Sequence, residues 1–118
     1  MKILIYKKSN GQRPLDKFLK SIDKEMKADV YAAIDNLKEK GNKLRFPYSR
    51  YLQDGIFELR IISSNGISRV LYFFYLKDCA VITHGFIKKT QKTHKLEIEK
   101  ANKYKKDFIN KNNDKVGD

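Results

Sequence analysis

Residues 56–76 have the sequence IFELRIISSNGISRVLYFFYL, which is two β-prone runs on either side of a Ser-Asn-Gly turn. Runs rich in β-branched and aromatic residues favour strands, and Asn-Gly between two such runs is a strong hairpin signal. We therefore predict strands over 56–63 and 67–76, which run antiparallel because the connection between them is so short. Side chains alternate along a strand, so Glu58 and Arg60 face one side of the sheet and the apolar residues around them face the other.

The rest of the sheet is predicted outward from this hairpin. A third β-prone run over 80–87 follows after Lys-Asp-Cys, a connection short enough to extend the antiparallel meander. The run Ile-Leu-Ile-Tyr at 3–6 predicts a short N-terminal strand. Between the N-terminal part of the chain and the meander, residues 43–55 are basic and aromatic, and we expect a loop or an edge segment there.

Helical periodicity lies on both sides of the meander. Apolar residues spaced by three and four follow Pro14, a residue suited to the first helical position. A second helix is predicted from its N-cap Asp23 to a stop at Gly41. Thr93 is the expected N-cap of a last helix, whose apolar side extends to Phe108. The order predicts an α+β domain: an N-terminal strand, a two-helix hairpin, a three-strand meander and a C-terminal helix against one small antiparallel sheet.

Length and composition limit the kind of protein further. The 118 residues predict one domain over 1–108, followed by a polar tail over 109–118 that we expect to fray. A single cysteine, Cys79, excludes an internal disulfide and the usual zinc spacings. The longest apolar run, 70–76, is far too short to span a membrane, and the first residues do not resemble a signal peptide. These features predict a cytoplasmic protein that does not associate with membranes.

Charge is the most informative bulk property. Lysine and arginine number 26 and aspartate and glutamate 14, so the net charge is +12. A domain this basic attracts polyanions, and either nucleic acid or an acidic protein partner fits that requirement.

Cations gather at the predicted strand ends: Arg60, Arg69, Lys88 and Lys89, with Lys92 shortly after. Arginine forks suit phosphate oxygens, and lysines act as compact point charges, so this set is typical of a phosphate site. The basic segment adds candidate RNA contacts at Lys43, Arg45, Tyr48 and Arg50, and its tyrosines, including Tyr51, can stack on bases. The alternative is a solvated basic face with ordinary ion pairs. His84 is either an acid–base group or, as strand histidines more often are, a packed residue.

Three segments in fixed order carry a family resemblance: GIFELR at 55–60, SRVLYF at 68–73 and HGFIKKT at 84–90. Together they resemble the phage-derived HigB-like toxins of the RelE/ParE superfamily, and the element order is similar over residues 1–108. The resemblance implies a RelE-like fold and a type II toxin–antitoxin toxin that cleaves messenger RNA on the ribosome. It also implies a cognate HigA-like antitoxin with a helix-turn-helix, through which alone the complex binds operator DNA.

Such a toxin needs no metal or other cofactor, because the 2′-hydroxyl of the RNA attacks the adjacent phosphate. Under that reading Arg60 and Arg69 stabilise phosphate charge, and Lys88 or Lys89 supplies charge or transfers a proton. Glu58 either orients Arg60 or serves as the base. Two other functions remain open: a ParE-like inhibitor of a protein target such as gyrase, and an RNA-binding module without chemistry.

Overall fold

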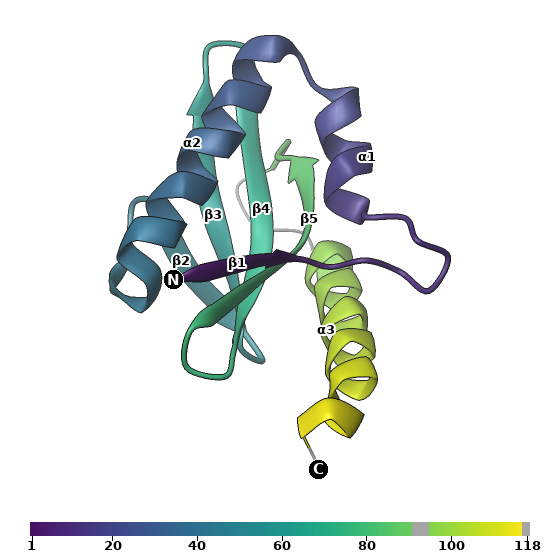
Figure 1. Cartoon of the computed structure of the whole chain (residues 1–118). Coiled ribbons are helices and arrows are strands. Elements are labelled where there is room, and N and C mark those ends of the chain that lie inside the picture. Colours follow the sequence, from purple (N-terminus) through teal and green to yellow (C-terminus); the bar gives the residue numbers. More distant parts are fainter. Residues whose placement is uncertain (91–94, 117–118) are drawn as a thin grey trace.

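The computed structural model describes residues 1–90 and 95–116, which form one sheet with helices on both faces (Figure 1). The elements in chain order are β1 (Lys2–Ile5), α1 (Pro14–Ser21), α2 (Lys24–Lys40), the 3-10 turn η1 (Gly41–Lys43), β2 (Ser49–Gln53), β3 (Ile56–Ser63), β4 (Gly66–Tyr75), β5 (Cys79–Ile87) and α3 (Lys95–Val116). No helix within the described ranges is long and apolar enough to cross a membrane.

The sheet has five strands in the order β1-β5-β4-β3-β2. The antiparallel meander of β3, β4 and β5 confirms the hairpin prediction, and the α+β architecture is that of a RelE-like fold. One pairing was not anticipated: β1 lies parallel to β5, with Lys2 opposite Cys79 and Ile5 opposite Ile82. The sheet is therefore mixed, because its edge strand β1, from the N-terminal end of the chain, runs parallel to β5, the last strand in the sequence.

Residues 43–55 contain a real edge strand, β2, which pairs antiparallel with β3. The two strands are joined by Asp54 and Gly55, both with positive φ, at 54° and 79°. Positive φ at both central residues is characteristic of a type I′ hairpin turn, for which Asp-Gly is a preferred sequence. Pairing through this turn places Arg50 directly opposite Glu58.

Helices α1 and α2 cover one face of the sheet. Asp23 caps α2 by accepting a 2.8 Å hydrogen bond from the Met26 backbone N–H, and Gly41 ends it, as predicted. The main buried cluster on this face consists of apolar and aromatic side chains: Leu15, Phe18, Leu19, Val30, Leu37, Leu44, Leu59, Ile61, Val70, Tyr72, Ala80 and Ile82. Two buried serines, Ser49 and Ser68, share the face, and the Ser49 hydroxyl is hydrogen-bonded to that of Tyr72. Hydrogen bonds from Ser63 to Asp29 and from Ser64 to Glu25 tie the β3–β4 turn to α2.

Helix α3 packs on the opposite face and covers only part of it. Its Ala101 joins a second buried cluster with Tyr6, Ile56, Leu71, Phe73 and Val81. Lys105 donates a 2.7 Å hydrogen bond to the Asp54 carbonyl, which anchors the helix to the β2–β3 turn. The tip of the β3–β4 hairpin remains uncovered on this face, where Ile62 is 77% exposed.

α3 continues to Val116, beyond Phe108, where the apolar pattern ends and where we expected a frayed tail. Polar contacts rather than apolar packing accompany this extension. The Lys111 ammonium lies 2.7 Å from Asp107 and also donates to the Lys7 carbonyl, while Asn112 donates to the Phe108 carbonyl. The predicted N-cap, Thr93, lies outside the described residues.

Candidate functional site

The part of the sheet that α3 leaves open carries a charged cluster, which we define as Arg50, Glu58, Arg60, Arg69 and Lys88. Strand register brings these residues together. Arg60 lies directly opposite Arg69 on β4, and Arg50 lies directly opposite Glu58. Residues that face each other across antiparallel strands point to the same side, so all four share the face of α3. Lys88 follows β5 immediately and bonds through its backbone N–H to the Ile67 carbonyl, 2.8 Å away.

Glu58 is the centre of this cluster and is 0% exposed. Its Oε2 lies 3.2 Å from Arg60 Nη1, and its Oε1 lies 3.5 Å from Arg69 Nε. A buried carboxylate is costly unless cations and hydrogen bonds compensate its charge. The two arginines provide that compensation, and in return the carboxylate holds their guanidinium groups side by side.

Burial acts on the cations as well. Arg69 is 4% exposed, and burial lowers its pKa; Glu58 opposes this shift, while Arg60 and Arg50 reinforce it. Its guanidinium stays charged, since arginine does not lose its proton in proteins. The pKa of Lys88 is also lowered, first by burial and then by the charge of Arg69. These interactions identify Lys88 as a member of the cluster and make its ammonium a better proton donor than an isolated lysine.

Phe46 is a site residue that sequence reasoning missed. Its ring is 66% exposed, and the Arg60 guanidinium lies over it, 4.9 Å from the centroid. A backbone hydrogen bond of 2.9 Å from Arg60 to Tyr48 holds this segment beside β3. Stacking on the ring helps to fix the plane of the guanidinium, which remains partly exposed. The only sequence signal for Phe46 was an aromatic residue among cationic ones. No alternating or helical pattern in this segment predicts where its side chain lies.

The structure separates the other predicted site residues. Of the four RNA-binding candidates that the structure describes, only Arg50 joins the charged cluster. Lys43, Arg45 and Tyr48 are exposed on the segment before β2, where the Arg45 guanidinium donates to the carbonyls of Asn42 and Leu44. Lys89 is exposed beside the cluster. Lys92 lies outside the described residues.

Tyr51 lies on the opposite face of the sheet from Arg50. It is paired with Phe57 across β2 and β3, and the two rings pack edge to face with centroids 5.1 Å apart. Its hydroxyl accepts a hydrogen bond from the Gly55 backbone. Tyr51 therefore supports the hairpin rather than the charged face.

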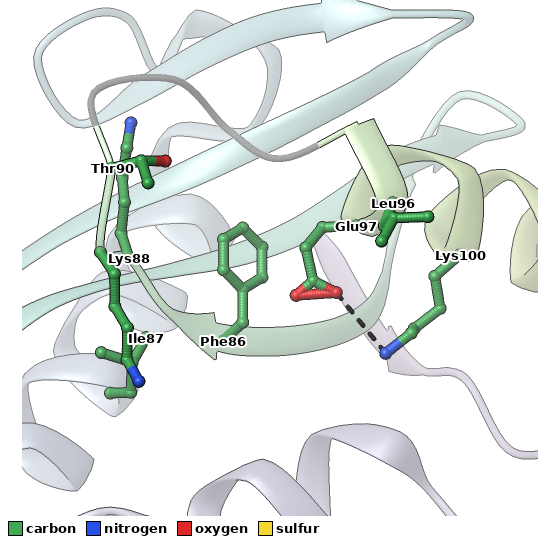
Figure 2. Close-up of a pocket in the computed structure, with 8 residues that line it drawn as sticks. Phe86, Ile87, Lys88, Thr90, Leu96, Glu97 and Lys100 are labelled. Carbon is green, nitrogen blue, oxygen red and sulfur yellow. Dashed lines mark ion pairs between the residues drawn. The ribbon is translucent and has the colours of Figure 1, made fainter.

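His84 lies two strands from Glu58, with Leu71 between them on the same face. It is buried against α3, where its Nε2 is 3.5 Å from Glu97 and its ring packs edge to face on Tyr104. Figure 2 shows Glu97 on the helix across from Phe86, and the dashed line joins Glu97 to Lys100, 3.5 Å away. These contacts describe a packed residue that links β5 to α3.

A shallow cavity of about 520 Å³ lies between the end of β5 and the start of α3 (Figure 2). Lys88 and Lys89 line it together with Phe86, Leu96 and Glu97. It therefore adjoins the charged cluster and adds an apolar wall to it. Within the described ranges, no three His, Cys, Asp or Glu side chains gather closely enough to hold a metal ion.

The fold and the site define a small RelE-like protein that presents cations around a buried glutamate on a half-open sheet face. A family model described as phage derived protein Gp49-like (DUF891) matches residues 17–106, roughly three quarters of the chain. The chain belongs to this Gp49-like family, which is associated with toxins of toxin–antitoxin systems. The matched range contains every residue of the charged cluster. Among curated proteins, none matches the chain.

Proposed function

We propose that this protein is the HigB-like toxin of a type II toxin–antitoxin pair and acts as a ribosome-dependent messenger RNA endoribonuclease in the cytoplasm. The observation that carries the proposal is the charged cluster, in which two arginines and a lysine converge on an open face around one buried carboxylate. Guanidinium and ammonium groups in this arrangement suit a phosphodiester. The net charge of +12 favours RNA in the same way.

The reaction needs charge stabilisation more than a cofactor. The 2′-hydroxyl passes its proton to solvent water and its oxygen bonds to phosphorus, while the bond from phosphorus to the 5′-oxygen breaks and that oxygen takes up a proton. The products are a 2′,3′-cyclic phosphate and a free 5′-hydroxyl. Arg60 would contact the non-bridging oxygens, where negative charge grows in the transition state, and the buried Arg69 would add its positive charge from beneath. Because Glu58 and Phe46 already hold Arg60 in place, little reorganisation is required during the reaction.

Lys88 is the candidate proton donor to the leaving 5′-oxygen, since burial and Arg69 both lower its pKa. Lys89, exposed next to it, would contribute charge only. Glu58 is 0% exposed and pinned between two arginines, so we assign it as a positioning residue rather than as the base. Arg50, Lys43, Arg45 and Tyr48 would contact flanking RNA, as would Lys92.

The test is induced expression in a bacterial host with mapping of RNA 5′ ends, comparing the wild type with Arg60→Ala. Arg60 is the better target because Arg69 still compensates Glu58 when Arg60 is removed, which protects folding. Lys38→Ala, which removes an exposed charge from α2, is the control for lost positive charge. New 5′-hydroxyl ends within translated messages should appear with the wild type and the control and fall by roughly 100-fold or more with Arg60→Ala.

Growth arrest with intact transcripts would overturn the nuclease proposal. DNA damage in the same cells would then point to a gyrase-directed inhibitor. Salt-dependent RNA binding without cleavage or growth arrest would point to a binding module, for which Arg60→Ala removes only about one phosphate contact.

A further inference from the structure

β5 extends well beyond its neighbour β1. The parallel pairing ends at Ile82, whose carbonyl accepts the last bond, from Tyr6, at 2.9 Å. The chain then leaves the sheet in a tight turn, in which Lys8 donates to Gln12 and Gly11 donates to Lys8. Among the described residues, no strand therefore lies beside the outer edge of β5 from His84 to Ile87.

The ladder on the other side of β5 shows which backbone groups face this edge. Lys88 donates to Ile67, so these two form a hydrogen-bonded pair. Bonded and non-bonded pairs alternate in an antiparallel ladder. Gly85 opposite Val70 and Ile87 opposite Ser68 are thus non-bonded pairs, and their N–H and C=O groups point away from β4. Across the described part of the chain, no backbone or side-chain group bonds to them there.

A cleft of about 940 Å³ runs along the same edge, with residues 84–87 in its floor. The turn after β1 and helix α1 form one wall, and α3 forms the other; Figure 1 shows the end of β5 between the two helices. Five cations line the cleft: Lys8, Arg13, Lys17, Lys20 and Lys100. Its two carboxylates are already paired, Asp16 with Arg13 at 2.8 Å and Glu97 with His84 and Lys100 at 3.5 Å each.

We propose that an extended acidic segment of a protein partner binds in this cleft as an additional strand beside β5. The unpaired peptide groups of Gly85 and Ile87 supply the hydrogen bonds of strand addition, which do not depend on sequence. Four of the cations, Lys8, Arg13, Lys17 and Lys20, lie on the wall of α1 and the turn before it and favour acidic side chains on the face of the incoming strand that meets this wall. Within the proposed toxin–antitoxin function, on which the partner's identity rests, the antitoxin would bind here, at the outer edge of β5, whereas the charged cluster lies on the open face of the sheet.

The binding test uses the isotope-labelled full chain and short synthetic peptides, followed by NMR of the backbone amides. The probe is the blocked hexapeptide EVEVEV, with KVKVKV as the charge-reversed control. We expect the acidic peptide to shift the amides of Gly85 and Ile87 and the lysine peptide to leave them unchanged. Shifts at β2, the other sheet edge, or no binding at millimolar concentration would overturn the proposal.

Two N-methylated versions of the acidic peptide separate strand addition from simple charge attraction. One version is methylated at every glutamate amide and the other at every valine amide, so each loses the donors of one strand edge. Strand addition predicts that only one of the two loses affinity, by about tenfold or more. Equal affinity of both versions would contradict strand addition.

Replacing a lysine of the protein with glutamate, once inside the cleft and once outside it, provides a matched comparison of peptide affinity. Lys17→Glu in α1 should weaken the acidic peptide by about tenfold, whereas Lys38→Glu, an exposed lysine outside the cleft, should have a much smaller effect. Equal losses would mean that only net charge is sensed, which overturns the site. None of these readouts involves RNA cleavage, so failure of the nuclease proposal would leave the binding result intact.

Discussion

The two faces of the sheet bury different chemistry. Beneath α1 and α2 the buried cluster is apolar or aromatic, as with Leu59 and Val70, and the buried Ser49 and Ser68 on this face carry no charge. Beneath α3 the face changes within one strand repeat, from Ile56 to Glu58 on β3 and from Leu71 to Arg69 on β4. α3 packs where this face is apolar, and the charges begin where its cover ends. One face thus holds the domain together, and the other combines a small core with a preformed charged surface.

The largest expected effect comes from breaking the buried charge pair. Arg69→Ala should lower the free energy of unfolding by about 3–5 kcal/mol, because the buried Glu58 then loses the guanidinium that lies 3.5 Å from its Oε1. Denaturant unfolding monitored by circular dichroism measures the loss.

A double variant shows whether uncompensated charge is the cause. Glu58→Gln with Arg69→Met removes both charges and should recover most of the lost stability, without recovering RNA cleavage. If the double variant were as unstable as Arg69→Ala, lost packing rather than weaker compensation of the Glu58 charge would explain the destabilisation.

A somewhat smaller loss of stability, without a loss of RNA cleavage, is expected from a substitution on the apolar face. Leu59 lies between Glu58 and Arg60 on β3 but is buried on the other side, 1% exposed. Leu59→Ala should cost about 2–4 kcal/mol through lost burial and the cavity left behind. At equal concentration of folded protein, its RNA cleavage should remain near that of the wild type. A loss of cleavage matching that of Arg60→Ala would show that the two faces are not independent.

Much of the fold follows from local sequence signals. β-prone runs separated by tight turns located β3, β4 and β5, and Asp23, Gly41 and the apolar spacing located α2. The parallel β1–β5 pairing could not be predicted in this way, because it joins distant segments and no local turn specifies it. β2 is different: Asp54-Gly55 is a hairpin signal that was present in the sequence and was overlooked.

The site residues likewise fall into those that local sequence patterns predict and those that they do not. Alternation alone placed Glu58 and Arg60 on one face, and the hairpin register then places Arg69 opposite Arg60. Phe46 could not be placed, since its position depends on the path of an irregular segment rather than on a period. The end of α3 was also missed, because polar contacts of Lys111 and Asn112 accompany it where the apolar pattern has ended.

The smallest expected effect comes from Glu97, which contacts His84 near the boundary between the apolar part and the charged part of the sheet face beneath α3. The pKa of Glu97 is lowered from its ordinary 4.5, first by the hydrogen bond from His84 and then, against the cost of burial, by the charges of His84 and Lys100. A lowered carboxylate pKa means that the folded state favours the ionised form. The resulting stability is present above pH 4.5 and is lost as the pH falls below it.

Glu97→Gln should therefore lower the free energy of unfolding by about 1 kcal/mol at neutral pH, and the difference from the wild type should shrink towards about pH 3. Glu99→Gln, an exposed neighbour on the same helix, removes an equal charge and should show almost no difference at either pH. Unfolding curves at several pH values measure both variants. If the difference between Glu97→Gln and the wild type did not change with pH, the Glu97 side chain would stabilise the contact between β5 and α3 through packing rather than through its charge.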